Sequence, residues 1–164
     1  MAKSDKPASI REAGHKQSRL FGQGKNILLD CKVPSRLEAI EKLAEAVNRA
    51  LPDPNLAFSA NLCLEELIIN TILYGFKGAA DRFIHVHMSV TGDWLEIVLK
   101  DNAPRFDPFV QAPKPNLELD IGERPIGGLG VHIVKTLMDE TQASYDGTGN
   151  TIVLRKRLPT KMPE

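Results

Sequence analysis

The sequence predicts an α+β domain, a two-layer sandwich with helices on one face of a mostly antiparallel sheet. Helical periodicity is concentrated early, between residues 35 and 76. The strand-like segments that follow come as pairs joined by short glycine-containing turns, and not as the repeated strand–helix–strand units of a parallel sheet. A chain of 164 residues is long enough to form one domain with a core of its own.

Composition excludes some classes of partner. Lysine plus arginine and aspartate plus glutamate number 21 each, so the formal net charge is zero. Binding to nucleic acid usually relies on an excess of positive charge, so we expect no direct contact with nucleic acid. We find neither a signal-peptide core nor an apolar run of membrane-spanning length. The sequence therefore predicts a cytoplasmic protein that makes no contact with a membrane.

Cysteine and histidine give little support for a metal site. Cys31 and Cys63 lie in apolar segments without Cys-x-x-Cys or Cys–His spacing. We expect buried thiols there, with a disulfide or a metal pair as the alternative. His85 and His87 share one face of a predicted strand, because side chains alternate along a strand. A metal pair at these two histidines would lack a third ligand nearby, so we expect them to face solvent.

The folded domain is expected to comprise residues 25–158. Residues 1–24 are polar and without a sustained period, which is typical of a flexible arm. Residues 159–164 are expected to form a short solvated tail. The domain then begins with a predicted strand at Lys25–Val33.

Two helices are predicted after this strand. Ser35 followed by Glu38 has the spacing of a capping box, which predicts a helix from this point to Leu51. Prolines and polar residues then break the periodicity. A second helix is predicted to run to Tyr74, and Gly75 is expected to end it in the usual manner of a C-terminal glycine.

Two hairpins and a third helix complete the predicted fold, with a long loop between them. Residues 101–124 contain several prolines, and a loop of this length in a compact domain tends to be functional or disordered. The predicted strands are Arg82–Val90, Trp94–Lys100, Gln142–Tyr145 and Thr151–Arg157, and the predicted helix is Gly130–Asp139.

The most apolar stretch, Asn61–Phe76, carries the first candidate site residues. Glu66 and Asn70 lie four residues apart, which places both on one face of a helix. Burial raises the pKa of a carboxyl group, so a partly buried Glu66 can accept a proton. The carbonyl oxygen of Asn70 can ligate a hard cation such as Mg²⁺. The pair suits phosphoryl transfer, and the alternative is an ordinary amphipathic helix with a solvated edge.

Two further motifs flank the long loop. Asp101 follows a strand directly and can accept a hydrogen bond from an exocyclic amine such as that of adenine, although such an aspartate also makes turns with its own backbone. The run Gly127-Gly128-Leu129-Gly130 precedes a helix, whose N-terminal N–H groups can bind a phosphate, although glycines also serve as plain turns. Together with the helical pair, these motifs would complete a nucleotide site.

The three motifs resemble the nucleotide-binding boxes of the Bergerat-fold ATPases, the superfamily of gyrase, the heat-shock chaperone ATPase and the histidine kinases. They read Glu66-x-x-x-Asn70, Asp101-x-x-Pro-x-Phe-Asp-Pro and, over 123–130, Glu-Arg-Pro-Ile-Gly-Gly-Leu-Gly. The closest resemblance is to the bacterial anti-sigma-factor serine/threonine kinases of the stress-response and sporulation type. It covers about residues 26–158 and implies the Bergerat ATP-binding fold with ATP or ADP and Mg²⁺ as ligands.

The resemblance implies a role for each motif residue. Glu66 would be the general base that takes the proton from a protein serine or threonine, and Asn70 would bind a Mg²⁺ ion that bridges the ATP phosphates. Asp101 would hydrogen-bond the adenine amino group. The other implied contacts are Ala103 and Phe106 near the base, Gly127, Gly128, Leu129 and Gly130 around the phosphates, Thr151 at the adenine end, and residues 107–126 as a mobile lid.

The resemblance also implies protein partners, namely a small anti-sigma-factor antagonist as the kinase substrate and a sigma factor held by a homodimer. The family usually has glycine where Ala103 stands, so its methyl group could crowd the adenine. Arg105 replaces a second glycine of the wider superfamily. These departures leave an alternative open, a nucleotide-dependent sequestering module with little or no kinase activity. His132 is expected to be a surface or lid contact.

Overall fold

The computed structural model describes residues 24–111, 118 and 129–159. Five strands, three longer helices and two short helical segments make up this part of the chain. In chain order the elements are β1 (Asn26–Pro34), α1 (Glu38–Ala50), α2 (Pro54–Asn70), the π-helical turn η1 (Thr71–Gly75), β2 (Phe83–Thr91), β3 (Trp94–Lys100), α3 (Pro108–Gln111), α4 (Leu129–Leu137), β4 (Glu140–Tyr145) and β5 (Asn150–Arg157).

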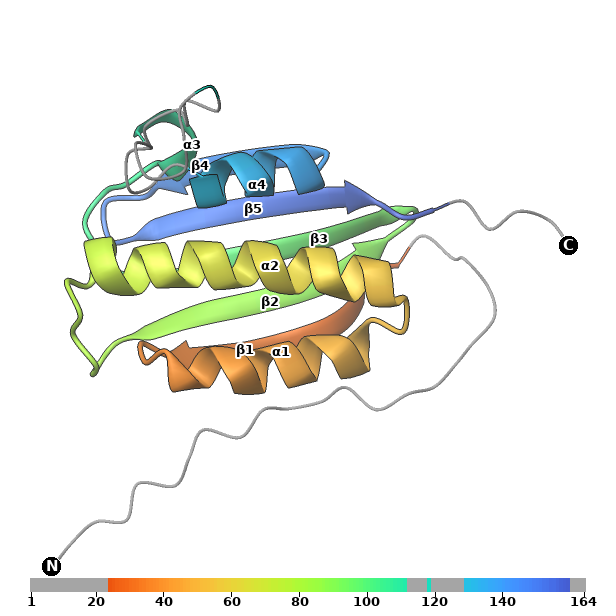
Figure 1. The fold of residues 1–164 in the computed structure, drawn as a ribbon, viewed down its shortest axis with the longest axis horizontal. Coiled ribbons are helices and arrows are strands. Elements are labelled where there is room, and N and C mark those ends of the chain that lie inside the picture. The colour runs from red at the N-terminus through yellow and green to blue at the C-terminus, as the bar shows by residue number, and fades with distance from the viewer. Residues whose placement is uncertain (1–23, 112–117, 119–128, 160–164) are drawn as a thin grey trace, which may run out of the picture.

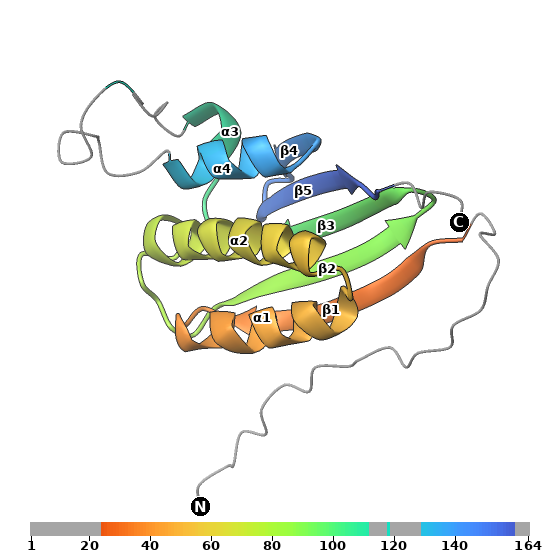
Figure 2. The same cartoon turned by 45° about the vertical axis from the view of Figure 1, so that its right-hand side comes forward.

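The strands form one sheet in the order β1-β2-β3-β5-β4, and every neighbouring pair is antiparallel. Helices α1, α2 and α4 lie side by side on one face of this sheet, with α2 in the middle (Figure 1). Figure 2 shows the same single layer of helices from a second direction. The structure therefore confirms the predicted two-layer α+β sandwich.

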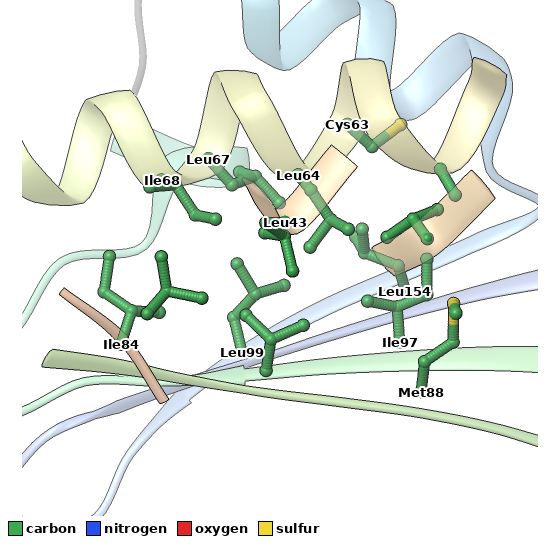
Figure 3. Close-up of a cluster of buried hydrophobic side chains, with 14 of the residues drawn as sticks. Leu43, Cys63, Leu64, Leu67, Ile68, Ile84, Met88, Ile97, Leu99 and Leu154 are labelled. Atoms are coloured by element: carbon green, nitrogen blue, oxygen red, sulfur yellow. The ribbon is translucent and has the colours of Figure 1, made fainter. Parts of the chain in front are cut away.

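The core lies between the sheet and α2. Alternate residues of each strand point toward the helices, as the pleat requires. Figure 3 shows leucine and isoleucine side chains of α2 packed over those of the central strands. The labelled side chains that are at most 3% exposed are Leu43 of α1, Cys63, Leu64, Leu67 and Ile68 of α2, Ile84 and Met88 of β2, Ile97 and Leu99 of β3, and Leu154 of β5.

The second helix and its π-helical turn together make an apolar run of membrane-spanning length, which the sequence analysis did not find. The segment Pro54–Gly75 is 22 residues long and, by length and composition alone, could cross a membrane, with a mean hydropathy of 1.4 in its most apolar window. Half of that window is buried within the domain. Because this helix is the one that covers the centre of the sheet, its apolar character is explained by the core.

The first helix does not begin as predicted. Leu37 is the residue at its N-cap position, and no side chain caps it. The Ser35 hydroxyl, which the capping-box pattern assigned to the helix, instead donates to the carbonyl of Ala79 at 2.5 Å and accepts from the N–H of Arg82 at 3.2 Å. Ser35 is buried and joins the start of α1 to the segment before β2. By contrast, Asp53 caps α2 by accepting from two backbone N–H groups.

The second helical run ends at Gly75, within one residue of the predicted end, but its last turn is not a regular α-helix. After Asn70 the backbone widens into the π-helical turn η1, in which Phe76 N–H donates to Thr71 C=O at 2.7 Å. The left-handed conformations come later, at Lys77 with a φ of 52° and Gly78 with a φ of 78°. Gly75 has a different role, which the candidate site explains.

The remaining elements agree with the sequence to within a few residues. The strand pairs lie where they were predicted, and Gly92, with a φ of 60°, makes the tight turn between β2 and β3. A short helix, α3, was not predicted in the proline-rich loop. It starts with Pro108, a favourable residue in a first helical turn, and Asp107 accepts a hydrogen bond from the N–H of Phe109.

The two cysteines are buried free thiols, as predicted. Burial raises the pKa of the Cys31 thiol to about 11 and that of Cys63 to about 12. A thiol with so high a pKa carries almost no thiolate at neutral pH, and the thiolate is the nucleophile. We therefore expect both cysteines, which are buried, to be unreactive in the folded protein.

Candidate nucleotide-binding site

Glu66 and Asn70 lie on α2, one turn apart and both half-buried. Burial raises the pKa of Glu66, and the negative charge of the exposed Glu65 beside it contributes in the same direction. A carboxylate with a raised pKa is a better proton acceptor than a solvated one. Asn70 is the last residue of α2, so it lies at the junction between the α-helix and the π-helical turn.

Gly130, in the first turn of α4, lies directly against the Glu66 carboxyl group. A Cβ atom at this glycine would be 2.0 Å from Glu66 Oε2 and 2.7 Å from its Cδ. No residue other than glycine allows this approach without displacing the Glu66 side chain. The structure thus brings together one residue of the first motif and one of the third. Leu129 also lies in this helical turn, whereas Gly127 and Gly128 are outside the described residues.

Asp101 forms a turn with the backbone that follows β3. Its Oδ1 accepts a hydrogen bond from the N–H of Ala103 at 2.9 Å and a second from Nδ2 of Asn150 at 2.9 Å. The first of these is the local turn that the sequence offered as the alternative role for this aspartate. The second fixes the same carboxylate from another strand, so Asp101 is held from two directions.

Asn150, the first residue of β5, is the site residue that the sequence analysis missed. Its side chain is buried and makes four hydrogen bonds to the segment after β3. The amide nitrogen donates to Asp101 Oδ1 at 2.9 Å and to the carbonyls of Ala103 at 3.3 Å and Pro104 at 3.0 Å. The amide oxygen accepts from the N–H of Phe106 at 2.9 Å. One side chain therefore holds the whole 101–106 turn.

Gly149, next to Asn150, permits this contact between segments. A Cβ atom at Gly149 would be 1.8 Å from the carbonyl oxygen of Asp101 and 3.0 Å from the Cα of Asn102. The backbone N–H of Asp101 also donates to the carbonyl of Asn150 at 3.1 Å. The hairpin between β4 and β5 and the end of β3 are thus in backbone contact, which requires glycine at this position.

Ala103, which replaces a usual glycine of the resembled family, is 3% exposed. Its methyl group packs against Gly75, because a Cβ atom at Gly75 would be only 3.0 Å from Ala103 Cβ. Gly75 thus makes room for the methyl group, which lies in the core and does not project from the turn. Arg105 is exposed, and Phe106 is half-buried.

Thr151 does not join Asp101. It pairs with Lys100 across β3 and β5, and the residues on either side of it, Asn150 and Ile152, are the buried ones. Because side chains alternate along a strand, Thr151 points to the face of the sheet away from the helices. Asn150, and not Thr151, is the β5 residue whose side chain lies beside Asp101.

The two histidines of β2 lie on that same helix-free face. His85 Nε2 contacts Asp30 Oδ1 of the neighbouring strand, and His87 Nδ1 lies 3.4 Å from Asp30 Oδ2. The hydrogen bond from His85 is the main cause of the lowered pKa of Asp30. Within the described residues, no group of three or more histidine, cysteine, aspartate or glutamate side chains could hold a metal ion. The histidines are part of a surface hydrogen-bond group.

The motif residues lie along α2 and its continuation η1. Glu66 marks one end of the site, where it touches α4, and Gly75 marks the other, where it touches the 101–106 turn. Nine residues of helix span roughly 13 Å, so the candidate site is elongated. A depression of about 300 Å³, lined by residues of β4 and β5 such as Glu140 and Arg155, lies elsewhere, so the candidate site is defined by the contacts described above. Of the expected lid, only 107–111 and residue 118 are described.

The antiparallel sheet covered by helices on one face is the Bergerat fold of ATP-binding domains. The sequence pattern of the histidine kinase-like ATPase domain family matches residues 33–156, most of the chain. The chain therefore belongs to this family.

Individual relatives point the same way. The serine-protein kinase RsbW of Listeria monocytogenes serovar 1/2a is 33% identical over 108 residues, which are 63% of this chain and 67% of that protein. The anti-sigma F factor of Halalkalibacterium halodurans is 27% identical over 96 residues, 58% of this chain and 65% of that protein. In both comparisons, the aligned residues make up about two thirds of the relative.

A solved structure shows the same fold. The crystal structure of the RsbU and RsbW domains of Rv1364c from Mycobacterium tuberculosis superposes with a TM-score of 0.55 at 17% sequence identity. The superposition covers 79% of this chain and 32% of that longer one. At this identity the likeness concerns the fold alone.

Proposed function

We propose that this protein is an ATP-dependent protein serine/threonine kinase that acts on a small anti-sigma-factor antagonist and sequesters a sigma factor or a similar regulator. The single observation that carries the proposal is the contact between the half-buried Glu66 carboxyl group and Gly130 in the first turn of α4. It places a proton acceptor beside a helix N-terminus, where phosphate groups are favourably bound.

In the proposed reaction, Glu66 takes the proton of the substrate hydroxyl group while the oxygen of that hydroxyl group bonds to the γ-phosphorus of ATP. The bond from that phosphorus to the bridging oxygen breaks, and ADP leaves. Burial raises the pKa of Glu66, which makes its carboxylate a stronger base toward the hydroxyl proton. Glu66 then returns the proton to solvent after the phosphoprotein has dissociated.

Asn70 would hold the magnesium ion that accompanies the nucleotide. Its half-buried amide lies on the same helical face as Glu66, and Mg²⁺ typically takes one or two protein oxygen ligands and completes its shell with phosphates and water. The residues present fit that requirement. When bound, the ion would neutralise charge that develops on the phosphates during transfer.

Asp101 would recognise adenine, with Phe106 beside the base. Asp101 is fixed in a turn at the opposite end of the site from α4. A carboxylate that is already held by the protein can accept a hydrogen bond from the exocyclic amine without losing further side-chain freedom. In this proposal Leu129 and Gly130, with Gly127 and Gly128, surround the phosphates.

The proposed partners follow the names of the relatives, serine-protein kinase RsbW and anti-sigma F factor. We propose a cytoplasmic homodimer that binds a sigma factor and releases it when an antagonist protein competes. The alternative motivated by Ala103 and Arg105 is a nucleotide-dependent sequestering module with little or no kinase activity, and the placement of these two residues does not favour it. The Ala103 methyl group packs on Gly75 and the Arg105 side chain is exposed.

The test compares Glu66→Gln with Glu65→Gln. Glu65 is the adjacent, exposed carboxylate on another face of the same helix, so it controls for loss of charge. Each variant is assayed for Mg-ADP binding by calorimetry and for transfer of the γ-phosphate of radiolabelled ATP to candidate antagonist proteins from the source genome. Glu66→Gln should bind ADP and lose transfer at least about a hundredfold, whereas Glu65→Gln should behave as wild type. Equal transfer by both variants would refute the base assignment.

A further inference from the structure

Asn150 is a buried polar side chain that the proposed mechanism leaves without a task. It lies at the end of the sheet nearest Asp101, and all four of its hydrogen bonds are made with the 101–106 turn. We propose that Asn150 is a positioning residue for base recognition, which holds the Asp101 carboxylate so that its second oxygen meets an exocyclic amino group. The inference rests on the proposed function and adds the residue that makes the site selective for an amino-bearing purine.

The orientation of the Asn150 amide is determined by its neighbours. On its nitrogen side lie three acceptors, namely Asp101 Oδ1 and the carbonyl oxygens of Ala103 and Pro104. On its oxygen side lies a donor, the N–H of Phe106. A flipped amide would set oxygen against three acceptors and nitrogen against a donor, so only one orientation is satisfied.

This orientation determines which oxygen of Asp101 serves a ligand. The hydrogen bonds that Ala103 and Asn150 give to the carboxylate both go to Oδ1. Oδ2 therefore retains its capacity to accept from a bound molecule. A 6-amino purine donates to such an oxygen, whereas a 6-oxo purine presents an acceptor there and is repelled.

No other side chain of similar size supplies the same bonds. Alanine would leave Asp101 Oδ1 with one donor fewer and leave the N–H of Phe106 and two carbonyl groups without their partner. Aspartate would place a second carboxylate at the 2.9 Å distance that now separates Asn150 Nδ2 from Asp101 Oδ1. Two carboxylates at that separation cannot both be ionised readily, so one proton would be shared between them.

The experiment measures binding of Mg-ADP and of Mg-inosine diphosphate, its 6-oxo counterpart, to the full chain by calorimetry. It uses wild type, Asn150→Ala, Asn150→Asp and Thr151→Ala, between pH 5.5 and pH 8. Thr151→Ala is the matched control, because Thr151 is the next residue and points to the other face of the sheet. Other ionisable groups near the turn, Arg105, Asp107 and Asp146, are common to all four proteins.

We expect wild type and Thr151→Ala to prefer ADP by at least about tenfold. Asn150→Ala should lose most of this preference, and ADP affinity should fall by about tenfold or more. Asn150→Asp should bind weakly at pH 8 and recover ADP binding as the pH falls, because a shared proton restores a donor toward Asp101. Wild type should show no such recovery.

Two other results have separate meanings. If wild type prefers ADP and both Asn150 variants keep that preference, or lose affinity for the two nucleotides by the same factor, the positioning role of Asn150 is refuted while the proposed function stands. If wild type itself shows no preference for ADP, adenine recognition and the proposed function fail together with it. Should Asn150→Ala not fold, Asn150→Asp decides, since its comparison at two pH values is made within one protein.

Discussion

Replacing Gly149 with alanine tests whether the backbone contact between the β4–β5 hairpin and the end of β3 organises the site. The new Cβ atom would be 1.8 Å from the carbonyl oxygen of Asp101 and 2.9 Å from its carbonyl carbon. A carbon and an oxygen in contact are normally about 3.3 Å apart, so one segment must move by about 1.5 Å. The atoms in the way belong to the backbone, and a side-chain rotation cannot relieve the overlap.

The expected loss of stability follows from these distances. Overpacking of this kind costs about 1–3 kcal/mol, and the displacement also strains the hydrogen bond from Asp101 N–H to Asn150 C=O, worth about 1 kcal/mol. We therefore expect Gly149→Ala to lose about 2–4 kcal/mol of unfolding free energy, measured by urea denaturation. Mg-ADP affinity of the protein that remains folded should fall by at least about tenfold, because Asp101 has moved.

Gly147→Ala is the matched control for Gly149→Ala. Gly147 lies in the same hairpin with a φ of 94°, and nothing is within 4 Å of the Cβ atom that alanine would add. Its substitution should cost about 1–2 kcal/mol through the left-handed backbone alone and leave ADP binding unchanged. If the unfolding free energy of Gly149→Ala is within about 0.5 kcal/mol of the wild-type value, or if the variant binds Mg-ADP equally well, the backbone contact at Gly149 does not organise the site.

Three further predictions concern other parts of the molecule. Gly130→Ala should fold with nearly wild-type stability, since the new Cβ displaces only the flexible end of Glu66. Phosphate transfer by this variant should nevertheless fall sharply, and wild-type transfer would contradict the proposed position of the base. Glu66→Gln should slightly raise the unfolding free energy at neutral pH, because a raised pKa means that the ionised form of Glu66 is disfavoured in the folded state. This gain should vanish as the pH falls below the ordinary carboxyl range, where Glu66 is neutral in both states. A gain that is equal at pH 3 and pH 8 would contradict this reasoning. Cys31 and Cys63, whose pKa values are raised to about 11 and about 12, should react with iodoacetamide only as fast as the protein unfolds, and rapid labelling of the native protein would refute their burial.

The fold was predictable because its signals are local and repeated. The hairpin strands alternate buried and half-buried residues, and the apolar residues of α2 suit a helix that packs against the sheet. Glu66 and Asn70 were singled out by a four-residue spacing, which any regular helix converts into a shared face. Their proposed roles in catalysis and magnesium binding stay predictions.

The errors arose where a distant segment decides what a residue does. Ser35 fits a capping box in sequence, but the partners of its hydroxyl group are Ala79 and Arg82, 44 and 47 positions away. Gly75 looks like a helix terminator, yet its lack of a side chain serves the packing of Ala103. No local pattern contains either contact.

The adenine end shows the same limit most sharply. Thr151 and Asn150 are neighbours in sequence, but the alternation of side chains along β5 sends them to opposite faces of the sheet. A shift of one residue therefore exchanges a site residue for a surface one. The signal that could have identified Asn150 is its place directly after Gly149 at the start of a strand.

The measurement that tests the central claim most directly is calorimetric titration of Mg-ADP into wild type and Asp101→Asn. Asparagine can keep its Oδ1 bonded to Ala103 and Asn150, so the turn survives. An NH₂ group then replaces Oδ2, and this donor repels an exocyclic amine. We predict that wild type binds Mg-ADP and that Asp101→Asn, equally well folded by circular dichroism, binds at least about tenfold more weakly. Absence of binding in wild type, or equal binding in both proteins, would contradict the assignment of a nucleotide site to this fold.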